Sequence, residues 1–220
     1  MKINPTRELV AQLAAQLICE QGIRDFSLAK RKAARQLGIA ESHHLPGTIE
    51  IEAALKNYQT LFQTDTHPAV LRQLRVVAID TMQMLAEFQP YLTGSVLNGT
   101  ANKHSDIQIE LFTDNEKDVE LFLLNRNMQF RQAQRQMSHQ GYHKQIPCFI
   151  LSNEICDIVI TVQPPAGKRS LPRSSRHEAA PKRASLNQLV ALLKKNEINA
   201  LSQQLVAVNS PYPLCTENDN

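Results

Sequence analysis

The spacing of hydrophobic residues changes near residue 90, and this change limits the folds open to the chain. Before that point apolar residues recur with the period of an α-helix, in four segments: 6–21, 27–37, 49–62 and 69–87. After it, short β-branched runs predict strands at 91–96, 107–113, 145–152 and 155–163, with helices at 116–127 and 185–195. The pattern predicts an all-helical first part followed by a part that combines helices with a sheet.

A break in the helical pattern at 64–68 predicts the first domain boundary. We expect an α-helical N-terminal domain at 1–66, an α/β domain at 67–200 and a partly disordered C-terminal tail at 201–220. The turn at Asn153-Glu154 is short enough to join the last two strands as a β-hairpin.

Composition favours a cytoplasmic protein without a membrane segment. The chain has 220 residues, 42% of them hydrophobic, but it contains no apolar run of about 18 residues and no apolar N-terminal stretch typical of a signal peptide. Its cysteines lack the spacing of a metal site, and two of them fall in strand-like apolar runs: Cys19, Cys148, Cys156 and Cys215. A reducing compartment fits this cysteine usage.

The positive charge of the chain is concentrated in one segment, 168–183. The net charge is +3, and this segment alone holds six Lys or Arg residues and one acid, which leaves 18 basic and 20 acidic residues elsewhere. Such a segment attracts phosphate or nucleic acid, or it is simply a solvated loop. The sequence leaves both interpretations open.

A possible phosphate-binding turn follows the strand expected at 91–96. Gly94 and Ser95 offer backbone N–H groups and a hydroxyl at the start of a turn, a combination suited to holding phosphate oxygens. Lys103 and Ser105 lie further along the same connection and are also candidates for nucleotide binding.

Acidic and amide side chains mark two of the expected strands. Asp106, Gln108 and Glu110 alternate with apolar residues and therefore share one face of their strand. Asp157 lies in an otherwise apolar strand, where a carboxylate is costly unless it is paired or binds a metal ion. Oxygen ligands of this kind suit a hard cation such as Mg²⁺.

The spacing of these residues resembles the signature of the DNA polymerase β nucleotidyltransferase superfamily, in particular its small bacterial, minimal members. The shared pattern is Gly94-Ser95, then Gly99, then Ser105-Asp106, and the resemblance covers roughly residues 69–163. It implies an α+β fold with a nucleotidyltransferase-like mixed sheet and flanking helices, here preceded by the helical N-terminal domain. It also implies that Gly94 and Ser95 hold the phosphates of a nucleotide.

The resemblance further implies a metal site for Mg²⁺ or Mn²⁺. Acidic residues at positions 106 and 108 bind the ions in this family, and Asp157 completes the site and helps to deprotonate the attacking hydroxyl. This chain has Gln108 in place of the second aspartate, and Glu110, two residues deeper, is a candidate substitute although it lies about 6–7 Å further along the strand.

Because Gln108 replaces an aspartate, three interpretations of the function are open. The chain is an active transferase that moves a nucleoside monophosphate from an NTP, with ATP favoured, to an unknown acceptor such as RNA or protein. Alternatively it is a catalytically impaired nucleotide- or RNA-binding protein with a regulatory role. In the third case it keeps only the fold, with Asp106 and Asp157 as structural remnants.

The N-terminal helices have a weak resemblance to a helix-turn-helix motif. Residues 27–37 form a basic helix, but the segment after it, 41–52, is acidic where a recognition helix normally carries basic or amide side chains. We therefore expect no sequence-specific DNA binding. The helices instead pack on the α/β part, bind a partner, or contact RNA.

Overall fold

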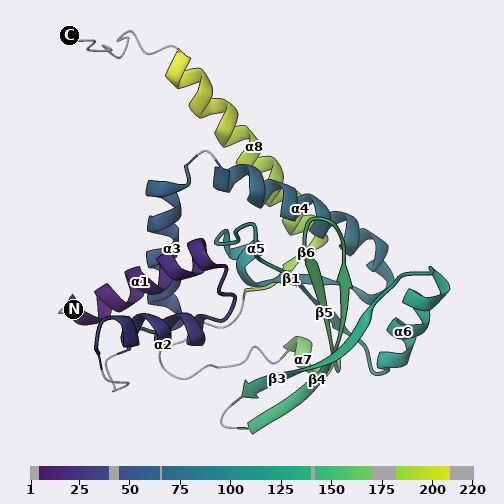
Figure 1. Cartoon of the computed structure of the whole chain (residues 1–220). Coiled ribbons are helices and arrows are strands. Elements are labelled where there is room, and N and C mark those ends of the chain that lie inside the picture. The colour runs from purple at the N-terminus through teal and green to yellow at the C-terminus, as the bar shows by residue number, and fades with distance from the viewer. Residues whose placement is uncertain (1–4, 40–44, 65, 140–141, 170–181, 209–220) are drawn as a thin grey trace, which may run out of the picture.

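The computed structural model describes residues 5–39, 45–64, 66–139, 142–169 and 182–208 (Figure 1). Within them the chain forms a helical unit, residues 5–62, and an α/β unit, residues 66–208, with a six-stranded mixed sheet. The α+β class expected from the sequence is confirmed.

Three helices make up the helical unit: α1 (Pro5–Gln21), α2 (Phe26–Gln36) and α3 (Thr48–Phe62). α1 packs against both of the others, and the buried cluster of this unit includes small side chains such as Ala14 and Ala33, which are fully buried. The Asp25 side chain caps α2 by accepting a hydrogen bond from the Ser27 backbone N–H at 2.7 Å, so this helix begins just before the start expected from the sequence.

The α/β unit contains these elements in order: α4 (Thr66–Met84), η1 (Ala86–Phe88), β1 (Tyr91–Thr93), α5 (Gly94–Asn98), β2 (Ile107–Phe112), α6 (Glu116–Asn125), β3 (Arg131–His139), β4 (Tyr142–Ser152), β5 (Asp157–Gln163), α7 (Ala166–Arg169), β6 (Ala184–Ser185) and α8 (Leu186–Val208). The sheet order is β3-β4-β5-β2-β1-β6. β2 and β5 run parallel, whereas the other neighbouring strands run antiparallel, including the expected hairpin of β4 and β5.

The two faces of the sheet differ in polarity. Ile107, Ile109 and Leu111 of β2 are fully buried in a hydrophobic core shared with α4, α6 and α8, and α4 lies beside α8 over this face (Figure 1). Gln108 and Glu110 alternate with them and point to the opposite face. The helical unit has its own cluster of buried apolar residues, separate from the core under the sheet.

Several element boundaries differ from those expected. The strand expected at 91–96 is wrong after Thr93, because the chain turns into α5 at Gly94. The helix expected at 185–195 continues to Val208, since no glycine or proline interrupts it, so the expected tail at 201–220 begins inside a helix. Residues 209–220 lie outside the described residues, as does most of the basic segment, 170–181.

Candidate functional site

Two carboxylates lie at the same end of the parallel strand pair. β2 and β5 are in register with Ile107 beside Ile158. Asp106 and Asp157 each directly precede one of these two residues, so their side chains point to the face opposite the hydrophobic core. The topology of the sheet therefore places two acids from distant parts of the sequence next to each other.

Both acids contact one arginine of the helical unit. Arg24 lies in the connection between α1 and α2, and its Nη1 atom donates a hydrogen bond to Asp106 Oδ1. The same nitrogen lies 3.7 Å from Asp157 Oδ2. The two carboxylates thus converge on a single cationic nitrogen atom.

The electrostatics of this pair reflect partial burial. Burial raises the pKa of the Asp106 carboxyl, and the nearby charge of Asp157 raises it further, whereas Arg24 and Arg135 act in the opposite direction. Asp157 also accepts a hydrogen bond from the Ser152 hydroxyl at 2.7 Å, which fixes one of its oxygens. A further positive charge close by would stabilise the ionised form of Asp106 in the same way.

Cys156 adjoins the pair but is poorly suited to coordinate a metal ion. Burial raises the pKa of its thiol to about 11, and the charges of Asp106 and Asp157 add to the shift against the opposing effect of Arg24. The thiol is therefore protonated at neutral pH, whereas the thiolate is the form that binds metal ions. The available oxygen ligands therefore define the chemistry of the site.

The Gly-Ser turn lies beside Gln108. Gly94 follows β1 with a φ of +74°, and a Cβ atom added there would lie 3.0 Å from Gln108 Oε1. Thr93 pairs with Gln108 across the β1–β2 ladder, which sets this close approach. The start of α5 and the Gln108 amide are thus placed together on the polar side of β2.

We predict that alanine at position 94 lowers the free energy of unfolding by about 1–2 kcal/mol, because a left-handed conformation is costly for a residue with a Cβ atom. The new methyl group also presses against the Gln108 amide, which should add to this cost. Gly38 is a matched control: its φ is +66°, but an added Cβ meets no described atom within 4 Å. Urea denaturation of both variants measures the difference, and equal costs would show that the contact with Gln108 is not restrictive.

The other candidates for nucleotide binding lie in the loop before β2. Ser105 shapes this loop, because its hydroxyl oxygen accepts a hydrogen bond from the Asn102 backbone N–H at 2.9 Å. Lys103 is exposed at the turn, two residues before it. The structure therefore gives Ser105 a local structural contact and leaves Lys103 accessible from solvent.

Glu110 has a separate partner on the same face. Its Oε2 atom accepts a hydrogen bond from Arg183 Nε at 2.5 Å, and both side chains are about nine-tenths buried. Arg183 also stacks on the Phe112 ring and donates to the Gly167 carbonyl. Glu110 lies four positions beyond Asp106, about 13 Å along an extended strand, so it occupies a different cluster.

The expected set of four metal ligands is therefore only partly assembled. Asp106 and Asp157 converge, Gln108 adjoins the Gly-Ser turn, and Glu110 pairs with Arg183. No group of three His, Cys, Asp or Glu side chains suitable for a metal ion occurs in the described part of the chain.

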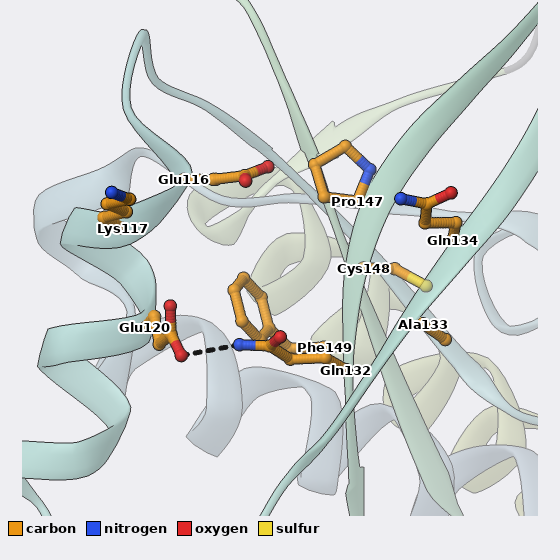
Figure 2. Close-up of a pocket in the computed structure, with 9 residues that line it drawn as sticks. All are labelled: Glu116, Lys117, Glu120, Gln132, Ala133, Gln134, Pro147, Cys148 and Phe149. Carbon is orange, nitrogen blue, oxygen red and sulfur yellow. Dashed lines mark hydrogen bonds between the residues drawn. The ribbon is translucent and has the colours of Figure 1, made fainter.

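A shallow pocket of about 330 Å³ lies elsewhere, between α6 and the β3–β4 ribbon (Figure 2). Glu120 accepts a hydrogen bond from Gln132 at 2.6 Å across it. Phe149 lines it and belongs to the hydrophobic core, so the pocket opens on the face of the sheet opposite to the carboxylate pair.

Comparisons with known proteins do not identify a family for this chain. No protein-family model matches it, and no curated protein matches it. Across the ranges that the structure describes, no helix is long and apolar enough to span a membrane.

Proposed function

We propose that this chain is a nucleotidyltransferase that uses Mg²⁺ or Mn²⁺ to transfer a nucleoside monophosphate from an NTP to a hydroxyl or phosphate acceptor. The convergence of Asp106 and Asp157 on one cationic nitrogen carries this proposal. The pair already holds a positive charge, and it lies on the same side of the sheet as the Gly-Ser turn.

The donor atoms fit such an ion. Mg²⁺ is held by one or two carboxylates, with water and substrate phosphates completing its shell. The two aspartates supply hard oxygen ligands, and the Gln108 amide adds a neutral oxygen near the Gly94 backbone. With only two carboxylates the ion depends on the nucleotide for tight binding, so the bound ion would neutralise phosphate charge during transfer.

The residues of the chain then have distinct roles. Gly94 and Ser95 hold the phosphates through backbone N–H groups at the start of α5. The acceptor oxygen attacks the α-phosphorus, the bond to the bridging oxygen breaks, and pyrophosphate leaves. Asp157, oriented by the Ser152 hydroxyl, takes the proton from the acceptor.

A catalytically impaired nucleotide-binding protein is the second candidate. Gln108 favours it, because the family that this sequence resembles has an aspartate at this position. The Gln108 amide, which lies against Gly94, lacks the charge of that aspartate. Such a protein binds nucleotide with the cation but does not form product.

Substitution of Gln108 by Asp separates the two candidates. Adding a carboxylate should tighten Mn²⁺ binding about tenfold, because the charge count of the ligands sets affinity for hard cations. The assay incubates the wild type and the variant with α-labelled NTPs and Mn²⁺ or Mg²⁺, then follows pyrophosphate release and labelled product.

Product from the wild type that requires the cation supports the transferase. Product from the Gln108→Asp protein alone supports the impaired protein. Gln134→Asp, an exposed change on the edge strand β3, is the control for added negative charge. If neither protein releases pyrophosphate or binds nucleotide in the presence of Mn²⁺, the proposed function is wrong.

A further inference from the structure

Arg24 belongs to a different structural unit from the acids that it contacts. The arginine follows α1 in the helical unit, whereas Asp106 and Asp157 belong to the sheet of the α/β unit. Its side chain is 54% exposed, compared with 18% for Asp106. The contact therefore joins the two units through a side chain that has room to move into solvent.

The connection that carries Arg24 is seated closely on the α/β unit. Gly22 has a φ of +66°, and a Cβ atom added there would lie 2.9 Å from the His104 ring. Nearby, the Asn102 amide donates a hydrogen bond to the Ile18 carbonyl at 3.2 Å. These two contacts place the arginine over the carboxylate pair.

The rest of the junction between the units is polar. Gln59 donates to the Thr100 carbonyl at 3.0 Å, and Asn98 donates to Glu52 at 3.2 Å. Three buried acceptor atoms at this junction have no hydrogen-bond partner: Gln59 Oε1, Asn98 Oδ1 and Thr100 Oγ1. A polar interface with unsatisfied groups and no shared hydrophobic core permits the two units to move relative to each other.

A divalent cation that binds between the two carboxylates competes with the guanidinium for the oxygens that Arg24 contacts. Both are positive, both seek the same oxygens, and repulsion between them is strong in a partly buried site. An ion bound to these oxygens therefore favours displacement of the arginine, and the arginine in its contact position weakens the binding of the ion.

We propose that Arg24 is a tethered competitor of the divalent cation, so that the seated helical unit holds the carboxylate pair closed until cation and nucleotide displace it. This inference rests on the proposed function, because it requires that the pair binds a cation. Ion binding and the contact between the two units then affect each other. Contact of the helical unit with the α/β unit weakens ion binding, and ion binding weakens that contact.

The test measures Mn²⁺ affinity by electron paramagnetic resonance, with and without a non-hydrolysable NTP. Replacing Arg24 with glutamine should tighten Mn²⁺ binding about tenfold, the scale of one charged hydrogen bond at a partly exposed site. Arg24→Lys keeps the competing charge and should stay close to the wild type. Arg72→Gln is the matched control. It also removes an arginine that pairs with an acid, because Arg72 on α4 pairs with Glu197 on α8, away from the carboxylate pair.

Hydrogen exchange gives a second readout on the wild type. Mn²⁺ with the NTP analogue should speed amide exchange in residues 18–25 and 98–105, and Asp106→Asn should remove this response.

The outcomes distinguish the two proposals. If the wild type binds Mn²⁺ through Asp106 but Arg24→Gln binds it equally or more weakly, the competition is wrong and the proposed function stands. If neither protein binds Mn²⁺ in a way that depends on Asp106, both proposals fail.

Discussion

Asparagine in place of Asp106 should reduce cation-dependent nucleotide transfer about a thousandfold or more, because a bound metal ion contributes several kcal/mol to the transition state. Asparagine keeps the size and one oxygen of the side chain but removes its charge. The loss should appear in kcat/KM for pyrophosphate release, together with weaker Mn²⁺ binding.

The folded state should tolerate this change. Burial already raises the pKa of Asp106, so the neutral amide avoids a desolvation cost, while the contact with the half-exposed Arg24 is lost. We expect a net change in unfolding free energy within about 1 kcal/mol. Asp80→Asn, an exposed change on α4, is the control for the chemistry of the substitution.

Retained transfer in a folded Asp106→Asn protein would contradict the assignment of this residue. Loss of transfer in the Asp80→Asn control as well would show that the effect is not specific to the carboxylate pair.

Alanine in place of Glu110 should lower the free energy of unfolding by about 3–5 kcal/mol, because it leaves the buried guanidinium of Arg183 without its countercharge. The two side chains are only 10–11% exposed and lie 2.5 Å apart. Urea denaturation followed by circular dichroism measures the loss.

A double substitution tests whether the loss of unfolding free energy comes from the unpaired charge of Arg183. Glu110→Met combined with Arg183→Met removes both charges and keeps apolar volume against the Phe112 ring, so it should recover most of the stability. If Glu110→Ala costs less than about 1 kcal/mol, the pair behaves as a solvated surface contact.

The sequence predicts much of the sheet because buried strands leave a strong pattern. In β2, apolar residues that enter the core alternate with polar ones, which correctly places Ile107 and Ile109 on one face. In β5, an acid at the start of an apolar run distinguishes Asp157. Both patterns are local and depend on which side of a strand meets the core.

Other elements lack such a pattern. β3 carries polar residues such as Arg131, Gln132 and Gln134, because it lies at the edge of the sheet and these side chains are exposed. β6 contains only two residues and pairs with β1 alone. Hydrophobic spacing cannot predict strands of these two kinds.

The partners of the acidic residues also could not be predicted. Arg24 is separated from Asp106 by 82 positions, and nothing in its local sequence distinguishes it from other surface arginines. Arg183 is similarly one basic residue among several in its segment, although it alone pairs with Glu110 among the described residues. Such pairs depend on how distant elements pack, which one sequence does not encode locally.

The central position of β5 has a consequence for how the protein acquires its site during folding. On either side of this strand, β1–β2 and β3–β4 form antiparallel pairs, each from neighbouring parts of the chain. β5 pairs with β4 on one side and β2 on the other, so it joins the ribbons and at the same time brings the second aspartate to the first. The two aspartates therefore lie side by side only once β5 has paired on both of its edges, and any ligand held by both acids would stabilise the pairing of β5 with β2.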